Sequence, residues 1–328
     1  MRTYLIYGCL CAILLGLFIV ATLAGKYPLS LNDISQALLS PTADSANQLV
    51  LWQVRFPRIF AALLVGASLA VAGAAYQGMF RNPLVSPDIL GVSTGAGLGA
   101  VLAIYANLPL FYVQLFALFG GLAAVTLVYS LAQLIRRHDA VLVLVLSGVA
   151  LSSLFGAGIS LVKVLADTDR QLPTITFWLL GSLNSVRLAD LLYSLPLIIG
   201  GLVVLFVLRW RMNLLALGDD EAAALGVNLK LTRILLIIAA TMVTASAISF
   251  TGIIGWVGLL IPHAARLLVG AHFSRLLPAS LLLGAIFLLL TDTIARTCFA
   301  VEMPLGVLTS LVGAPFFMLL LACGGRKA

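Results

Sequence analysis

Charged residues are scarce in this chain, and their scarcity is the first constraint on its class. Only 9% of the residues are Asp, Glu, Lys or Arg, whereas 62% are hydrophobic. Soluble domains contain about 25% charged residues and about 45–50% apolar residues. The interior of a water-soluble protein of this length cannot bury so many apolar side chains. The composition therefore excludes an ordinary soluble domain.

Residues and motifs that support catalysis or metal binding are also few. The three histidines are scattered, and Cys9, Cys11, Cys298 and Cys323 have no metal-binding or redox spacing, so we interpret the cysteines as apolar packing residues. The segment GVSTGAGLGA at 91–100 lacks the Lys-Ser/Thr pair of a P-loop and follows no predicted strand. These absences disfavour an intramembrane enzyme. Any nucleotide that drives this protein has to be bound by another subunit.

Long apolar runs recur along the whole chain. A run of about 20 residues covers about 30 Å as a helix, which is the thickness of the hydrocarbon core of a membrane. Many runs are rich in Leu, Ala and Gly without strict alternation, which favours helices over a membrane β-barrel. We predict an all-α polytopic membrane protein in which residues 1–328 form one transmembrane domain. The ten predicted spans are 4–25, 57–80, 91–106, 112–134, 141–165, 191–208, 231–249, 253–269, 278–297 and 304–323.

The first apolar run could also be a secretory signal, since Arg2 precedes it and Thr22-Leu23-Ala24 could serve as a cleavage site. The run is longer than the apolar core of a usual signal peptide, and more spans follow it. We therefore interpret it as the first transmembrane helix.

Basic residues are unevenly divided between the two predicted sides of the membrane. By the positive-inside rule, both termini and the loop 209–233 are predicted to be cytoplasmic. The net charge of +7 follows from this bias, and no basic cluster is interleaved with aromatic residues, so no nucleic acid is expected as a partner. Twelve of the 19 Lys and Arg residues lie on the cytoplasmic side: Arg2, Arg81, Arg136, Arg137, Arg209, Arg211, Lys230, Arg233, Arg266, Arg275, Arg326 and Lys327.

One cytoplasmic segment, LLALGDDEAAALGVNLKLTR at 214–233, is unusually polar. Its three consecutive acids are a quarter of the twelve in the chain, and Gly218 and Gly226 interrupt it. We predict two short helices with turns at the glycines, and the acids are placed to complement a helix N-terminus. The apolar residues that need a surface to bury them are Leu217, Ala224 and Leu225. The segment is either an ordinary solvated loop or a docking element for a cytoplasmic partner.

Glycines and outer arginines provide two further signals. Gly91, Gly95 and Gly99 are spaced four residues apart and predict a small-residue face where a second helix approaches closely. Arg55 and Arg58, at the outer start of the second span, run against the positive-inside bias. So does Arg296 near the outer end of the ninth span, which could snorkel or pair locally with Asp292, four residues earlier.

Lone ionisable residues that could contact a substrate or serve a structural role are Lys163, Asp190 and His263.

Four segments spread over nearly the whole chain match one set of known motifs. They are RFPRIFAALLVGASLAVAGAAYQGMFRNPLVSPDILGVSTGAGLGA (55–100), LLALGDDEAAALGV (214–227), FTGIIGWVGLLIPHAARLLVG (250–270) and PLGVLTSLVGAPFFMLLL (304–321). With these motifs in this order, the chain resembles the FecCD permease family. Its members are the membrane subunits of type II ABC importers for iron-siderophores, haem, vitamin B12 and, in some cases, molybdate.

The resemblance implies an architecture and a set of partners. It implies ten helices per subunit, paired as a homodimer or close heterodimer around a central path in the bacterial inner membrane, among membrane lipids. Two cytoplasmic ATPase subunits bind ATP and Mg, so this chain binds no cofactor, and a periplasmic or lipid-anchored protein delivers the substrate. The residues that match the family's ATPase-coupling helices are Leu217, Gly218, Asp219, Asp220, Glu221, Ala224, Leu225 and Gly226.

The resemblance also implies roles for residues at the two ends of the path. In the family, arginines that match Arg55, Arg58 and Arg296 receive acidic side chains of the binding protein. The residues that match the cytoplasmic gate are Asn82, Pro83, Leu84, Val141 and Leu142. The substrate is expected to be an iron-siderophore or haem, then a corrinoid, then molybdate. The alternative is a transporter driven by an ion gradient, which would need a carboxylate near the membrane midplane; Asp292 is the candidate, and it lies near the outside.

Overall fold

The structure, a computed structural model, describes residues 2–39, 46–135 and 140–324. Within these ranges it contains helices and no β-strand, which confirms the all-α prediction. Seven of the described helices are long and apolar enough to cross a membrane, and three shorter apolar helices accompany them. Each predicted span therefore has a helix. The long helices are α1 (Arg2–Leu23), α4 (Phe56–Met79), α6 (Leu110–Leu134), α7 (Ala140–Leu165), α9 (Leu188–Leu215), α11 (Leu229–Thr251) and α13 (Phe273–Thr297). The shorter ones are α5 (Val92–Tyr105), α12 (Val257–Val269) and the part of α14 (Leu305–Gly324) up to Leu319, beyond which the side chains lie outside the described part.

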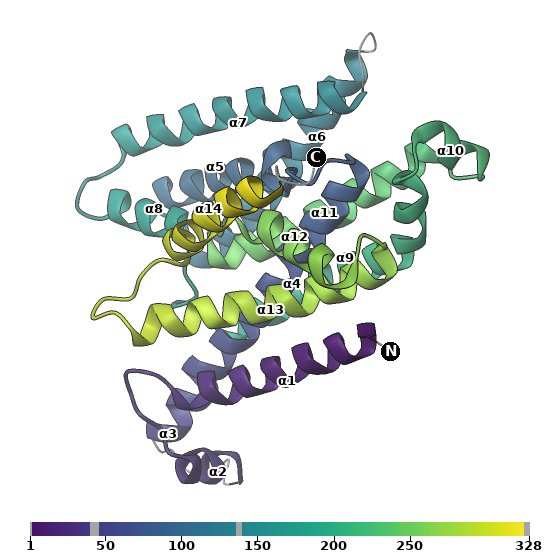
Figure 1. The fold of residues 1–328 in the computed structure, drawn as a ribbon. Helices are drawn as coiled ribbons and strands as arrows, with labels where there is room; N and C mark the ends of the chain where they lie inside the picture. Colours follow the sequence, from purple (N-terminus) through teal and green to yellow (C-terminus); the bar gives the residue numbers. More distant parts are fainter. Residues whose placement is uncertain (1, 40–45, 136–139, 325–328) are drawn as a thin grey trace.

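Short helices mark the two ends of the bundle (Figure 1). The start of α1 and the short helix α10 (Asp219–Ala224) lie at one end, which we call the α10 end. The end of α1 lies at the other, which we call the α2 end, with α2 (Leu31–Leu39) and α3 (Ala46–Leu49). The π-helical turn η1 (Val50–Arg55) joins α3 to α4 without a break. The remaining short elements are the 3-10 helix η2 (Pro87–Leu90) and α8 (Gln171–Leu180).

Helices α4 and α11 form the buried centre of the bundle, because most of their side chains have little or no exposure. Alanine and glycine dominate α4, so other backbones can approach it closely. A methyl group at Gly66 would overlap the carbonyl oxygen of Gly284 in α13, and one at Gly73 would overlap that of Gly258 in α12. Helix α4 therefore packs against two neighbours with almost no side chain between them.

The predicted glycine face on 91–106 is present only in part. Gly95 and Gly99 lie against α6, where a methyl group at Gly95 would stand 2.6 Å from the carbonyl oxygen of Gly120. The prediction is wrong for Gly91, which precedes the helix with a φ of 75° and faces the Ser152 side chain of α7 instead. A turn residue at positive φ favours glycine for its backbone conformation rather than for helix packing.

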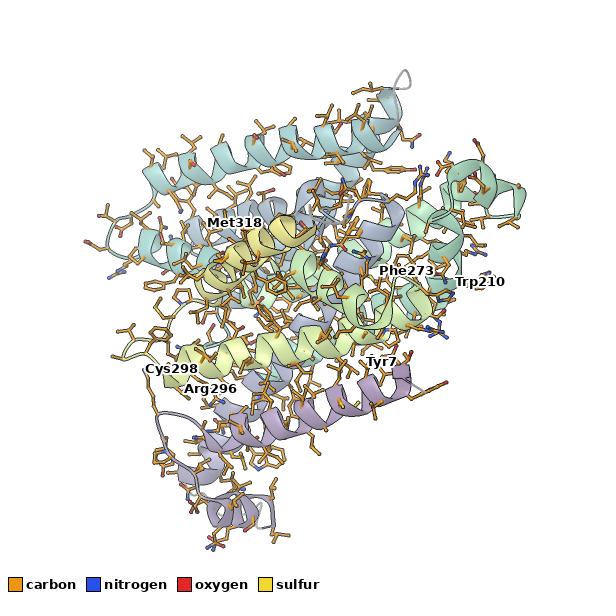
Figure 2. All side chains as sticks on the ribbon, in the orientation of Figure 1. Tyr7, Trp210, Phe273, Arg296, Cys298 and Met318 are labelled. Atoms are coloured by element: carbon orange, nitrogen blue, oxygen red, sulfur yellow. The ribbon has the colours of Figure 1, made fainter. Side chains whose placement is uncertain are left out.

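Several helices expose large apolar side chains on the surface of the single chain. Leu146, Leu154 and Leu161 are exposed on α7, and Met318 is exposed on α14 (Figure 2). These faces are suited to lipid or to a second subunit. The interpretation of the cysteines as packing residues is wrong within this chain, because the side chains of Cys9, Cys11 and Cys298 are exposed. The side chain of Cys323 lies outside the described part.

Candidate functional site

The segment 214–233 forms a protruding turn at the α10 end (Figure 1). Gly218 and Gly226 have φ values of 146° and 82°, conformations that favour glycine, so both predicted turns are present. The prediction of two short helices is wrong, since the six-residue α10 is alone between α9 and α11. The second predicted helix is instead the first turn of α11, which Asn228 caps by accepting a hydrogen bond from the backbone N–H of Leu231 at 3.0 Å.

The three acids of this turn divide into one that is paired and two that are free. All of them lie in the first turn of α10, where the helix dipole favours negative charge. The Asp219 carboxylate accepts two hydrogen bonds from Nη2 of Arg233, at 2.8 and 2.9 Å, and lies 3.8 Å from Nη2 of Arg81. Asp219 therefore ties α10 to α11 and to the loop after α4. Asp220 and Glu221 are exposed and form no ion pair among the described residues.

Apolar side chains surround the two free acids. Leu217 and Leu225 are 61% and 60% exposed, and Ala224 is exposed as well. Besides the Asp219 contacts, α10 is held by Ala222, which is fully buried against the bundle. Large aliphatic side chains on a protruding turn are costly in water unless a partner covers them. The turn thus presents an apolar surface with two unpaired carboxylates, arranged for contact with another molecule.

The predicted gate residues also lie toward the α10 end. Asn82 and Leu84 are exposed in the loop after α4, where the Asn82 side chain accepts a hydrogen bond from the backbone N–H of Leu84 at 2.9 Å. Leu142, in the first turn of α7, is 50% exposed. The side chain of Val141 lies outside the described part. Phe80 and Leu144 line one cavity, so the loop after α4 and the start of α7 are near neighbours.

The outer arginines form a buried cluster at the α2 end around Asp292, which has no exposed surface. Arg58 donates from Nε to both Asp292 carboxylate oxygens at 2.8 and 3.1 Å, and from Nη1 to Glu302 at 3.1 Å. Nε of Arg296 lies 3.6 Å from Asp292, so the local pair that the sequence allowed is present. We call Arg55, Arg58, Arg296, Asp292 and Glu302 the outer ion cluster.

The cluster also holds the end of α1. Arg55 donates to the backbone carbonyls of Thr22, Leu23 and Tyr27, and Arg296 donates to those of Ala21 and Ala24. These carbonyls include the last turn of α1, which lacks partners within the helix and carries partial negative charge. Figure 2 shows Arg296 at this end of α13, beside α1. The arginines therefore have structural partners that the sequence did not indicate.

Burial distinguishes these arginines from free surface groups. Arg55, Arg58 and Arg296 are only 4%, 7% and 7% exposed. They line a cavity of about 210 Å³ together with Lys26 and Glu302. Three arginines against two carboxylates leave the outer ion cluster with a net charge of +1. A carboxylate from outside would have to enter this cavity rather than meet an exposed surface.

A larger cavity at the α2 end was not predicted from the sequence. It has a volume of about 810 Å³ and is lined by α8, the start of α9 and the segment before α14. Asp190 lies in its wall, but its carboxylate accepts hydrogen bonds from Gln114 and from the backbone N–H of Arg187, both at 2.8 Å, so it has a structural role. The ten-residue α8 gave no span signal because it is too short to cross a membrane.

Comparisons with known proteins identify related chains. The sequence profile of the FecCD transport family matches residues 13–322. The molybdate import system permease MolB of Haemophilus influenzae is 41% identical over 297 residues, covering 89% of this chain and 88% of the relative. An iron chelatin transport system permease of Helicobacter pylori is 40% identical over 312 residues, covering 93% and 94%. A solved inward-facing structure of a metal-chelate type ABC transporter is 39% identical, has a TM-score of 0.88, and covers 97% of this chain and 98% of its own.

Proposed function

This chain belongs to the FecCD transport family, and on that premise we propose that it is the membrane permease subunit of an ABC importer for metal chelates. The observation that carries the proposal is the α10 turn. It presents exposed Leu217 and Leu225 with free Asp220 and Glu221, on a polytopic chain whose sequence has no P-loop. Such a permease needs a contact through which a separate ATPase, with its ATP and Mg, drives the helices.

We propose that the α10 turn docks on that ATPase subunit. Leu217 and Leu225 supply apolar contact area, and Asp220 and Glu221 pair with basic side chains of the partner. Movement of α10 reaches α11 through the Asp219–Arg233 pair and the loop after α4 through Arg81. This route leads toward the gate residues Asn82, Leu84, Val141 and Leu142. The α10 end is accordingly placed in the cytoplasm of a bacterial cell, and the α2 end outside the inner membrane.

At the α2 end, we propose that a substrate-binding protein docks over the outer ion cluster. The net charge of +1 and the cavity beside Arg55, Arg58 and Arg296 suit an entering acidic side chain. We propose further that two copies, or this chain and a close relative, pair around the transport path. The exposed apolar faces of α7 and α14 are available for that contact.

The substrate is proposed to be a chelate of iron, either a siderophore or haem, ahead of a corrinoid and molybdate. The cavity of about 810 Å³ at the α2 end supports a bulky ligand over a small oxyanion. The decisive measurement is uptake of labelled ferric chelate, haem, corrinoid and molybdate by the reconstituted importer. Transport of molybdate alone would overturn this order of substrates.

The ATP-driven mechanism is tested in proteoliposomes that contain this chain with its ATPase and binding protein. Uptake should require ATP on the ATPase side and should survive an ionophore that abolishes ion gradients. The purified chain alone should hydrolyse no ATP. Uptake that persists without the ATPase and stops with the ionophore would instead establish the gradient-driven alternative. The fully paired state of Asp292 argues against that alternative, because such carriers need a carboxylate free to exchange its cation.

Docking at the α2 end is tested by the dissociation constant of the binding protein across a salt series. Arg55→Glu/Arg58→Glu should weaken binding most at low salt, where screening is least. Because both arginines are buried, unfolding of the variant has to be measured in parallel. The control is Arg170→Glu/Arg187→Glu, which reverses two exposed charges at the same end. Equal affinity of the Arg55/Arg58 variant and the wild type at every salt concentration, with a folded variant, would remove the docking role.

A further inference from the structure

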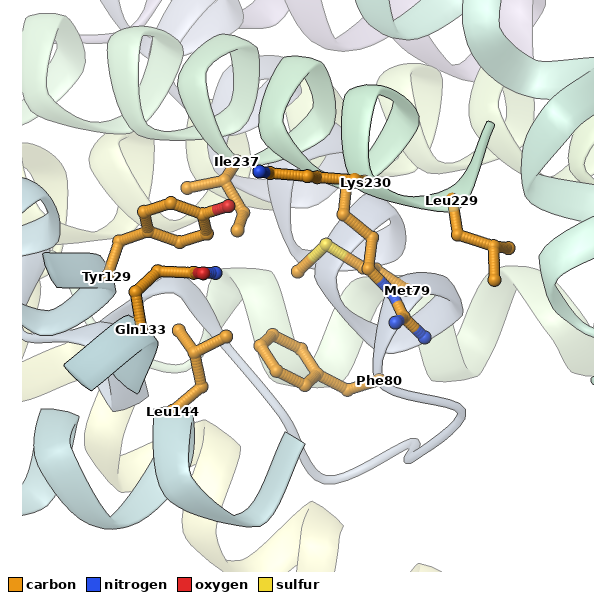
Figure 3. A pocket seen from close by; sticks show the side chains of 9 residues that line it. Met79, Phe80, Tyr129, Gln133, Leu144, Leu229, Lys230 and Ile237 are labelled. Carbon is orange, nitrogen blue, oxygen red and sulfur yellow. The ribbon is translucent and has the colours of Figure 1, made fainter. Parts of the chain in front are cut away.

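A crevice between α6 and α11 shares Arg233 with the proposed coupling route, but the transport scheme above assigns it no occupant. It consists of two adjoining cavities of about 240 and 230 Å³, which share Tyr129 and Ile237. The first lies at the α10 end, where it also includes Met79 and Phe80 at the end of α4 (Figure 3). The second continues from it along α6 and α11 into the part of the bundle that spans the membrane.

The first cavity combines a largely apolar lining with a positive charge and several hydrogen-bond donors. Lys230, Arg233, Gln133 and Tyr129 line it, and no acidic residue of the described ranges 2–39, 46–135 and 140–324 does. Figure 3 shows the Lys230 chain, the Tyr129 hydroxyl and the Gln133 amide directed into this space. Among the described residues, none of these three side chains has a hydrogen bond or ion pair, and Nε of Arg233 is buried without a partner. The cavity thus offers several unused hydrogen-bond donors and at least one unneutralised cation.

The second cavity is largely apolar, although four hydroxyl groups line it, including that of Tyr129, which it shares with the first cavity. Thr126 and Ser130 donate back to carbonyls of their own helix at 2.8 and 2.7 Å, and the Thr241 hydroxyl pairs with that of Tyr76 at 2.9 Å. These three hydroxyls are therefore already satisfied. The remaining lining is aliphatic, from Leu122, Val125, Ile234 and Ile238. Ile238 is 54% exposed, so the groove opens toward the surroundings of the helix bundle.

We propose that this crevice binds one anionic phospholipid of the cytoplasmic leaflet. The phosphate lies against Lys230 and Gln133, and an acyl chain lies in the groove beneath Tyr129. The order of the two cavities, charged at the α10 end and apolar toward the membrane, matches the order of headgroup and chain in that leaflet. Basic pockets between transmembrane helices at the cytoplasmic surface suit anionic headgroups, and an acyl chain can enter the open groove directly from the bilayer. The proposal rests on the orientation proposed above.

The test measures lipid retained by the purified full-length chain from mixed phosphatidylglycerol and phosphatidylcholine micelles, by mass spectrometry of the intact protein. Wild type should retain phosphatidylglycerol preferentially. Lys230→Gln should lower that preference about five-fold, the effect of one basic residue on an anionic lipid. Arg209→Gln, which removes an exposed charge from the end of α9 outside the crevice, is the matched control and should leave the preference unchanged. Equal retention of the two lipids by wild type would overturn the proposal.

A second variant separates a lipid from a free phosphate or a protein partner. Thr126→Phe fills the apolar groove from an exposed position of α6, so the chain should still fold. It should lower retention of phosphatidylglycerol while leaving the binding of inorganic phosphate unchanged. Unaltered lipid retention would limit the site to a phosphate group, and a change from dimer to monomer would assign the crevice to a second copy; either result overturns the proposal. Lipid retention is measured without transport, so a negative result would refute the lipid site without refuting the proposed importer function.

Discussion

Replacement of Asp292 by asparagine should destabilise the folded chain strongly. Asp292 has no exposed surface, accepts two hydrogen bonds from Arg58 and lies 3.6 Å from Arg296. Asparagine keeps the shape but removes the carboxylate that, among the described residues, both arginines share, and the net charge of the outer ion cluster rises from +1 to +2. Removal of one partner from a buried ion pair typically costs about 3–5 kcal/mol.

The lower part of that range is expected for Asp292→Asn. Arg58 keeps its bond to Glu302, and Arg296 keeps the carbonyls of Ala21 and Ala24, so neither arginine loses every partner. A loss of about 3 kcal/mol corresponds to a change of roughly a hundredfold in the unfolding equilibrium. The same loss should release the end of α1, which the arginines hold.

The assay is reversible unfolding of the purified chain by a denaturing detergent in mixed micelles, followed by circular dichroism. Glu302→Gln is the matched control: its side chain is 28% exposed, so water can replace part of the lost interaction and the loss should be smaller than for Asp292→Asn. Asp292→Asn should unfold at a clearly lower detergent fraction than Glu302→Gln. If the two variants and the wild type unfold together, the buried cluster does not stabilise the fold, and the reasoning is refuted.

Three further substitutions test the coupling turn and the helix packing. Gly226→Val should impair ATPase association, because the φ of 82° at this position strains any residue with a Cβ by about 1–3 kcal/mol. Gly8→Val, at an uncrowded position, is the control and should not impair it. Equal co-purification of the ATPase with both variants would contradict this prediction. Asp219→Asn should reduce the stimulation of the ATPase by the transport complex without preventing assembly, because it weakens the contact between α10 and Arg233 of α11. Unchanged stimulation would exclude the Asp219–Arg233 pair as the coupling route. Gly73→Val should prevent accumulation of folded protein, since its side chain would overlap the α12 backbone, and normal yield and stability would show that the helices can separate.

The membrane class and the position of each span followed from the sequence because they depend on local composition. An apolar run of sufficient length has to be a helix in lipid, whatever its neighbours are. The turns at Gly218 and Gly226 were equally local, since glycine between helix-forming residues marks a break. The number of helices in that turn was predicted wrongly, because the ends of α9 and α11 extend beyond their apolar cores.

By itself, then, the sequence determined the all-α membrane fold, the ten apolar segments and the polar turn that became α10. Only the tertiary structure decided which charges are free and which are paired. Arg58 and Asp292 are 234 residues apart in the chain, and Asp219 meets Arg233 only because α10 folds back on α11. It also decided that Gly91 makes a turn while Gly95 and Gly99 pack, and that α6 and α11 leave a crevice. These outcomes depend on distances between helices, and residue spacing along a single helix carries no information about them.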